Sequence, residues 1–278
     1  MDLIDSHIHA ESLSWSNLVD MSMSGIRSAV TFPVCPWRAG INTSIQITLI
    51  KWLLHHETWR AAENNIQLFL GIGVPAIGIP SDFETFCQKM EELAKNPKVV
   101  AIGEVGFDPR SEVCKDIRIQ GKVLRAQLEI AKRKKLPVVL HTPPDSAKSR
   151  IEFKKKYDKR MFLEKSLELV HEVGISPCRV VLDHLDKAEW IQMALDQGCY
   201  AGITIQEWRG VSPELAARWA EEFGPKRILL NSDTSTLASD HLGVPKVVFH
   251  LCRRKIKGKM IKKIIYDNPI QFYQLSLE

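Results

Sequence analysis

Side chains of the kinds that bind metal ions recur where apolar segments of the chain end. Six residues stand at these positions: His7, His9, Glu104, His141, His184 and Asp233. Imidazole and carboxylate groups suit Zn, Mn, Fe and Ni ions. A lone histidine at a strand end is more often a hydrogen-bonded structural residue, but six ligand-type residues at equivalent positions predict a metal site.

This set is large enough for two metal ions. His7 and His9 are two residues apart, so both point to the same side of a strand end. Glu104 stands within an apolar stretch, where a charged group is costly unless it is paired or bound to metal. A carboxylate such as Glu104 is therefore a candidate bridge between two ions.

Short apolar segments rich in β-branched residues must position these side chains. Several are almost continuously apolar, which is typical of parallel strands buried on both faces. The predicted strands are Leu3–Ser6, Ile26–Phe32, Ile66–Gly71, Val99–Gly103, Pro137–Leu140, Arg179–Asp183, Cys199–Ile203 and Arg227–Leu230.

Amphipathic helical patterns lie between these strands. The predicted helices include Ser81–Lys95, Ile119–Lys134, Phe162–Val173, Ala188–Asp196 and Pro213–Phe223. Ser212 before Pro213 is typical of an N-cap followed by proline in the first helical turn.

Eight strands alternating with helices over about 250 residues predict an α/β fold, a (β/α)8 TIM barrel in a single domain. That domain is expected to span residues 1–278. A doubly wound open sheet is the rival, but no glycine-rich phosphate-binding turn follows the first strand, where Ser6–His9 stands. In a barrel the strand ends converge on one mouth, so the six residues would face one another.

Composition excludes several classes of protein. The chain has 278 residues, of which 45% are hydrophobic and 26% charged, unlike collagen-like or disordered chains. It has no uncharged apolar run near the roughly 20 residues that span a bilayer. Asp2 and Asp5 argue against a secretory signal, and the six cysteines form no CxxC pair. These features predict a cytoplasmic protein with no membrane partner.

The balance of charge permits an anionic substrate without requiring one. The formal net charge is +5. Lys148–Arg160, a strongly basic segment, follows His141 at a place where it can line the mouth and attract phosphates. Trp37, Trp208 and Arg209 also follow predicted strands, and we interpret them as packing residues rather than a stacking surface for bases.

Short motifs in a fixed order resemble those of a known family. They are Asp5–His9, Gly103–Asp108, Gln120 with Gln127, Pro137–His141, His184, Ser232–Thr234, and Asn268-Pro269 with Phe272. In this order they resemble the TatD family of metal-dependent hydrolases, within the amidohydrolase superfamily. The resemblance covers nearly the whole chain.

The resemblance implies two divalent ions per chain, with Zn, Mn, Mg, Co and Ni as the candidates. One ion would be held by His7, His9 and Asp233, and the other by His141 and His184. Glu104 would bridge them. The superfamily more often uses a carboxylated lysine as the bridge, so a glutamate favours the TatD branch.

The implied activity is hydrolysis of phosphodiesters in DNA or RNA by a hydroxide that bridges the two ions. Asp233 and Glu104 would be the catalytic residues, with Asp233 accepting the proton. Asp108 and Asp183 are expected to orient ligand histidines, although Asp108 is equally placed to cap a turn before Pro109.

Departures from the family pattern keep other functions open. His141–Pro144 has no arginine after the histidine, and Asp233–Leu237 lacks the usual proline. Asp183–Asp186 is closer to lactonase-like relatives. The alternatives are a hydrolase of small lactones, esters, amides or phosphotriesters, and a metal-binding scaffold without catalysis. The sequence leaves the oligomeric state open.

Overall fold

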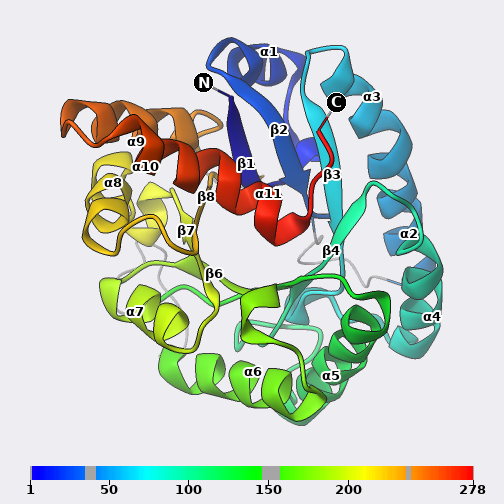
Figure 1. Ribbon diagram of the computed structural model, residues 1–278. Helices are drawn as coiled ribbons and strands as arrows, with labels where there is room; N and C mark the ends of the chain where they lie inside the picture. The colour runs from blue at the N-terminus through cyan, green and yellow to red at the C-terminus, as the bar shows by residue number, and fades with distance from the viewer. Residues whose placement is uncertain (1, 35–41, 146–156, 236–238, 278) are drawn as a thin grey trace.

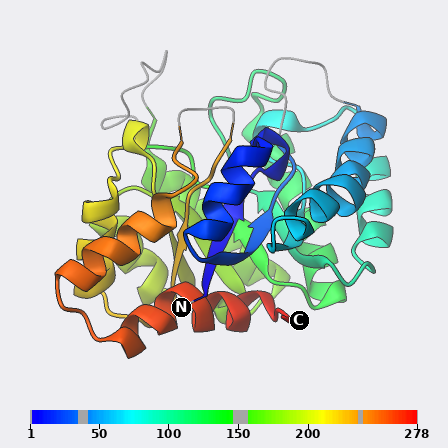
Figure 2. The ribbon, with the colours of Figure 1, turned by 90° about the horizontal axis from the view of Figure 1, so that it is seen from above.

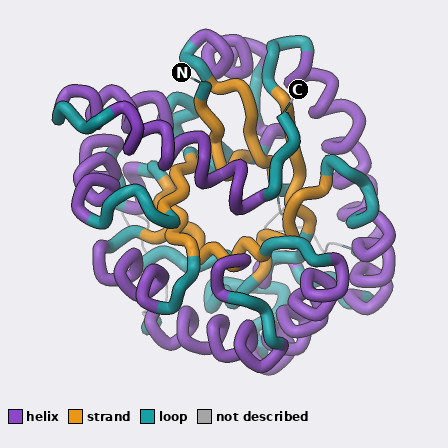
Figure 3. The backbone as a smooth tube through the Cα atoms, in the orientation of Figure 1, coloured by secondary structure: helices purple, strands orange, loops and turns teal. Residues whose placement is uncertain are grey.

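The computed structural model of the chain is an eight-stranded barrel surrounded by helices (Figure 1; Figure 3). It describes residues 2–34, 42–145, 157–235 and 239–277. The strands are parallel and hydrogen-bonded in chain order, from the first to the eighth. The eighth strand returns to the first, since the Asp233 amide donates to the His7 carbonyl (3.0 Å) and the His9 amide to the Thr234 carbonyl (2.9 Å). The predicted TIM barrel is therefore confirmed.

All eight predicted strands are present, with differences only at their ends. They are β1 (Leu3–Ile8), β2 (Ile26–Thr31), β3 (Gln67–Ile72), β4 (Val99–Val105), β5 (Val138–Leu140), β6 (Val180–Leu185), β7 (Tyr200–Thr204) and β8 (Ile228–Asn231). Because β1, β4 and β6 run further than predicted, His7, Glu104 and His184 lie within strands rather than after them.

The described helices follow the strands, one or two after each of β1 to β7 and three after β8, and most of them surround the barrel. They are α1 (Trp15–Met23), α2 (Thr43–Trp52), α3 (Thr58–Ala62), α4 (Phe83–Leu93), α5 (Ile117–Lys134), α6 (Lys159–Val173), α7 (Ala188–Asp196), α8 (Pro213–Glu222), α9 (Gly243–Arg253), α10 (Gly258–Lys262) and α11 (Asn268–Tyr273). The five predicted helices correspond to α4–α8. Ser212 caps α8 as predicted, because its side chain accepts a hydrogen bond from the Leu215 amide (3.2 Å).

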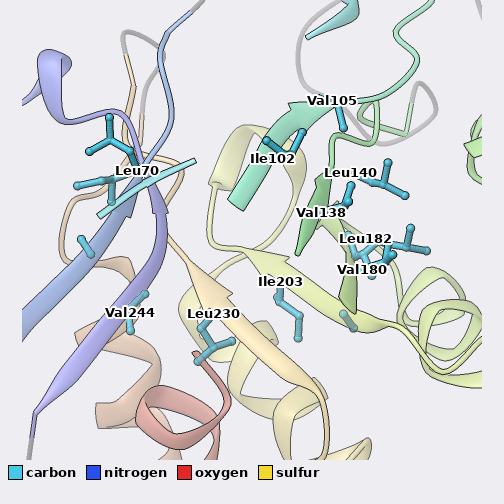
Figure 4. Close-up of a cluster of buried hydrophobic side chains, with 14 of the residues drawn as sticks. Leu70, Ile102, Val105, Val138, Leu140, Val180, Leu182, Ile203, Leu230 and Val244 are labelled. Atoms are coloured by element: carbon cyan, nitrogen blue, oxygen red, sulfur yellow. The ribbon is translucent and has the colours of Figure 1, made fainter. Parts of the chain in front are cut away.

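Two apolar layers stabilise the barrel. Outward-facing strand residues such as Ile102, Leu140 and Leu182 are buried between the strands and the helices (Figure 4). A second cluster fills the barrel interior. At the amino ends of the strands α11 lies across the opening (Figure 2) and contributes Phe272 and Tyr273 to that interior cluster. This end of the barrel is therefore filled by apolar side chains, and the open end is the one formed by the carboxyl ends of the strands.

Removing the Phe272 ring should destabilise the barrel from its closed end. Phe272 is 3% exposed, and its ring centroid lies 4.8 Å from that of Tyr200. We expect Phe272→Ala to lower the free energy of unfolding by about 3–5 kcal/mol, because it leaves a cavity. Urea denaturation measures the change.

Phe249→Ala is the matched control, since Phe249 on α9 is 57% exposed. Its effect should stay within about 0.5 kcal/mol. Equal destabilisation by the two substitutions would contradict a sealing role for α11.

Candidate metal centre

The six predicted residues lie together inside the carboxyl end of the barrel. The most exposed side chain among them, Glu104, is only 11% accessible. Three overlapping groups have ligand atoms within 4.8 Å of one another: His7, His184 and Asp233; His7, His9 and Glu104; and Glu104, His141 and His184. The structure thus brings together every residue that the sequence selected.

Irregular strands aim these side chains into the barrel. The register between neighbouring strands shifts between Asp5 and Ile8 in β1, between Ile102 and Val105 in β4, and between Leu182 and Leu185 in β6. Side chains on a regular strand alternate between its faces, and a bulge interrupts this alternation. In β6 the adjacent residues Asp183 and His184 therefore both face the cluster.

Two of the six residues have an unusual backbone. His184 has φ of 59° and Asp233 has φ of 44°, in the left-handed region that non-glycine residues rarely adopt. Such strain persists only where surrounding structure enforces it, and it is concentrated at functional sites.

Glu104 lies between three histidines. Its Oε1 is 2.5 Å from Nε2 of His184 and 3.1 Å from Nδ1 of His141. Its Oε2 is 3.8 Å from Nε2 of His7. One carboxylate thus lies near histidines of two of the three candidate ligand groups.

Asp233 faces the other side of the cluster. Its Oδ1 lies 3.2 Å from Nε2 of His9 and 3.9 Å from Nε2 of His7. Its Oδ2 lies 3.7 Å from Nδ1 of His184. With His7 and His184, this carboxylate forms one of the three candidate ligand groups.

Outer contacts fix the ring orientations of the histidines. Nδ1 of His7 lies 2.7 Å from Oδ2 of Asp183, and Nδ1 of His9 lies 2.8 Å from the Phe32 carbonyl. These contacts leave Nε2 of both rings toward the cluster, an arrangement common among metal-binding histidines. Nε2 of His7 is buried and has no hydrogen-bond partner among the described residues. A buried atom of this kind is costly unless a ligand satisfies it, so the site fits a cation.

A chain of hydrogen bonds joins two of the histidines behind the cluster. Nδ1 of His184 lies 2.9 Å from the Thr204 hydroxyl, which donates to Oδ1 of Asn231 (2.8 Å). Nδ2 of Asn231 donates to Oδ1 of Asp183 (2.8 Å), the residue that contacts His7. The sequence analysis missed Thr204 and Asn231, although both are polar residues that end apolar strands.

Asp108 performs both roles considered for it. Its Oδ2 lies 3.1 Å from Nε2 of His141, and its Oδ1 accepts from the Arg110 amide (2.8 Å) in the turn after β4. Burial opposes ionisation of this carboxyl, but the Arg110 guanidinium, which binds it, holds its pKa well below the usual range. Asp108 is therefore a fixed negative charge beside His141.

Burial opposes every charge in the cluster. It prevails at His184, whose pKa is lowered, whereas opposite charges prevail at the two carboxylates and at His9. Despite that burial, His7 and His184 hold the pKa of Glu104 well below its usual range. The pKa of Asp233 is lowered in the same way by His184 and His9. In return, the hydrogen bond and charge of Asp233 outweigh the burial of His9 and raise its pKa to about 9. The cluster is built to hold ionised carboxylates beside cations.

The departures from the family pattern have structural partners nearby. The Thr142 hydroxyl donates to the Asp183 carbonyl (2.6 Å). Asp186 accepts from the Asp145 amide and from Nζ of buried Lys159, each at 2.7 Å. These hydrogen bonds connect the segment after β5 to the end of β6 and the segment that follows it.

Other sequence predictions fall partly outside the described residues. Trp37 and residues 148–156 of the basic segment lie there, as do the last two residues of the Asp233–Leu237 turn. Trp208 and Arg209 are both buried. The burial of Trp208 agrees with the packing interpretation, whereas the guanidinium of Arg209 lies beside Asp233. Within the described ranges, no helix is long and apolar enough to cross a membrane.

Known metal-dependent hydrolases resemble this chain over nearly its whole length. The family model of TatD related DNases matches residues 4–274. An uncharacterized metal-dependent hydrolase of Methanocaldococcus jannaschii is 28% identical, over 98% of this chain and 100% of the relative.

Solved structures share the fold. A TatD-like protein from Archaeoglobus fulgidus superposes with a TM-score of 0.76 at 26% identity, over 98% of this chain and 100% of that one. The phosphotriesterase homology protein of Escherichia coli has a TM-score of 0.70 at 16% identity, covering 98% and 99% of the two chains, and so supports the barrel fold alone. With the family model matched from the first strand to α11, the chain belongs to the TatD-related DNase family of metal-dependent hydrolases.

Proposed function

We propose that the chain, as one domain over residues 1–278, is a phosphodiesterase that cleaves DNA or RNA with two divalent ions. The observation that carries this proposal is the position of Glu104, which belongs to two of the three candidate ligand groups. One of these groups contains His7 and His9, and the other contains His141 and His184. A carboxylate shared in this way supports two neighbouring ions.

The proposed ligands are those that the family resemblance implies. His7, His9 and Asp233 would hold one ion, His141 and His184 would hold the other, and Glu104 would contact both. The candidate groups support this set, and Nε2 of His9 lies 3.2 Å from Oδ1 of Asp233. Zn, Mn, Mg, Co and Ni are the candidates, since imidazole and carboxylate ligands suit several of them. Ions at this site would polarise the oxygen at the bond to be broken and acidify a water molecule.

Asp233 is the proposed proton acceptor. Its lowered pKa keeps the carboxylate ionised, and its Oδ2 is not within hydrogen-bond distance of Nδ1 of His184. The backbone of Asp233 is held in place, because Nε2 of Gln206 donates to its carbonyl (2.9 Å). The carboxylate therefore accepts a proton from the attacking water and passes it to the leaving oxygen. Glu104 would hold the ligand group of His7 and His9 and that of His141 and His184 in fixed positions for this step.

Nucleic acid is the proposed substrate because the family is described as DNases and the chain carries a net charge of +5. Action in the reducing cytoplasm fits the five described cysteines, all of which are free thiols. Small lactones, esters, amides and phosphotriesters are the competing substrates, and the cleavage assay below includes a neutral lactone and an ester.

Asn231→Ala should weaken metal binding without removing a ligand. Asn231 links Asp183 and Thr204, which orient His7 and His184. Loss of such an outer contact commonly lowers metal affinity by about 10- to 100-fold. Titration of Mn²⁺ or Zn²⁺ into chelator-treated protein measures the affinity.

Asn64→Ala is the matched control, because Asn64 is also buried but donates to the Arg60 carbonyl, away from the cluster. Its metal affinity should equal that of the wild type. An unchanged affinity in Asn231→Ala would show that the hydrogen-bond chain does not support the ligands.

Asp233→Asn should abolish most cleavage of end-labelled single-stranded DNA in Mg²⁺, Mn²⁺, Co²⁺ or Zn²⁺. A missing general base typically costs about 10²- to 10⁴-fold in rate. Asp20→Asn, which alters a carboxylate with 53% side-chain exposure, should cleave like the wild type. If the metal-loaded wild type cut no DNA or RNA but opened a lactone or ester, the nuclease proposal would fail.

A further inference from the structure

Arg209 is a buried arginine fixed beside the cluster. It lies in the 3-10 turn Glu207–Arg209 that follows β7, and it is 4% exposed. Its Nε donates to Oε1 of Gln206 (2.9 Å), and its guanidinium carbon lies 4.5 Å from the centre of the Trp208 ring. Gln206 is in turn bonded to the Asp233 carbonyl, so the guanidinium is held at a set position relative to Asp233.

The two terminal nitrogen atoms of the Arg209 guanidinium make no hydrogen bond to the described residues. Nη2 lies 4.0 Å from Oδ2 of Asp233, which is beyond hydrogen-bond distance. Nη1 is buried and has no hydrogen-bond partner among the residues that the structure describes. Arg110, after β4, is in contrast bound by Asp108 through Nε and Nη2. A buried guanidinium with unused donors is costly unless something satisfies it.

At the proposed metal site, His7 also has a buried nitrogen atom without a hydrogen bond to the described residues. This atom is Nε2, and His7 is a proposed metal ligand. His7 and Arg209 both approach Asp233, with Nε2 of His7 lying 3.9 Å from its Oδ1 and Nη2 of Arg209 lying 4.0 Å from its Oδ2. The imidazole nitrogen of His7 suits a metal ion, and the guanidinium of Arg209 suits an oxygen that carries negative charge.

Metal binding would weaken the pairing of Arg209 with Asp233. Asp233 is a proposed metal ligand, so its carboxylate would be shared between a metal ion and the guanidinium whose Nη2 lies 4.0 Å from its Oδ2. An anionic oxygen of a ligand would then supply negative charge to Arg209.

We propose that Arg209 binds a negatively charged oxygen of the substrate, that of a phosphate group, beside Asp233. The inference rests on the proposed function, and it narrows the substrate to one that carries an anionic group at the bond to be cleaved. The planar guanidinium suits phosphate because it offers parallel N–H donors. A neutral lactone or ester has no charge for this group to bind.

Inorganic phosphate is the probe, titrated by calorimetry into the metal-loaded protein. We expect Arg209→Gln to weaken phosphate binding about tenfold or more while the metal content stays unchanged, because it removes a charged hydrogen-bond donor. Arg209→Lys, which keeps the charge without the planar fork, should lose less. In cleavage of single-stranded DNA, Arg209→Gln should raise KM or lower kcat.

Arg179→Gln is the matched control, since Arg179 also has buried guanidinium nitrogens without described partners but precedes β6 at the opposite end of the barrel. It should bind phosphate like the wild type. Equal phosphate affinity in Arg209→Gln and the wild type would overturn the proposal, as would loss of metal from Arg209→Gln or an absence of phosphate binding by the loaded wild type.

The two proposals fail separately. Phosphate binding that depends on Arg209, in a protein that cleaves no nucleic acid, would leave the anion site standing and reject the nuclease function. Cleavage of nucleic acid that is indifferent to Arg209→Gln would do the reverse.

Discussion

The burial of two ionised carboxylates inside the barrel mouth is the constraint on which the site depends. Glu104 and Asp233 lie where water is nearly excluded, and an ionised group is stable there only beside positive charge. Histidine rings supply that charge from three directions around Glu104. The same geometry accepts divalent cations in place of ring protons, since the distances bring ligand atoms within 4.8 Å of one another.

The barrel and the ligand positions were predictable because both follow from local pattern. Continuous apolar segments indicated buried parallel strands, and parallel strands in a barrel bring their carboxyl ends to one mouth. A polar residue such as Glu104 at the end of such a segment must then face that mouth. The strand ends were harder to predict, because an apolar run does not show where hydrogen bonding stops. This is why His184 lies within β6 instead of after it.

The supporting contacts were not predictable, because they depend on residues distant in the sequence. Thr204 ends β7 and Asn231 ends β8, and either could have been an isolated polar strand end. Only the closed barrel shows that they join His184 to Asp183. Strict alternation would also have put Asp183 and His184 on opposite faces, and the bulge in β6 that brings both inward has no signature in the local sequence.

Gln206 joins Asp233, a proposed metal ligand, to Arg209, the proposed binding group for substrate phosphate. Its side chain donates to the Asp233 carbonyl and accepts from Nε of Arg209. Nη2 of Arg209 and Oδ2 of Asp233 are thereby kept 4.0 Å apart, close enough for their charges to attract but beyond hydrogen-bond distance. An attacking water must lie next to its proton acceptor while the phosphate charge is held close by. The 4.0 Å separation between Asp233 and Arg209 would suit both proposed roles, since a close hydrogen-bonded pair would occupy the donors and acceptors that the proposed reaction requires.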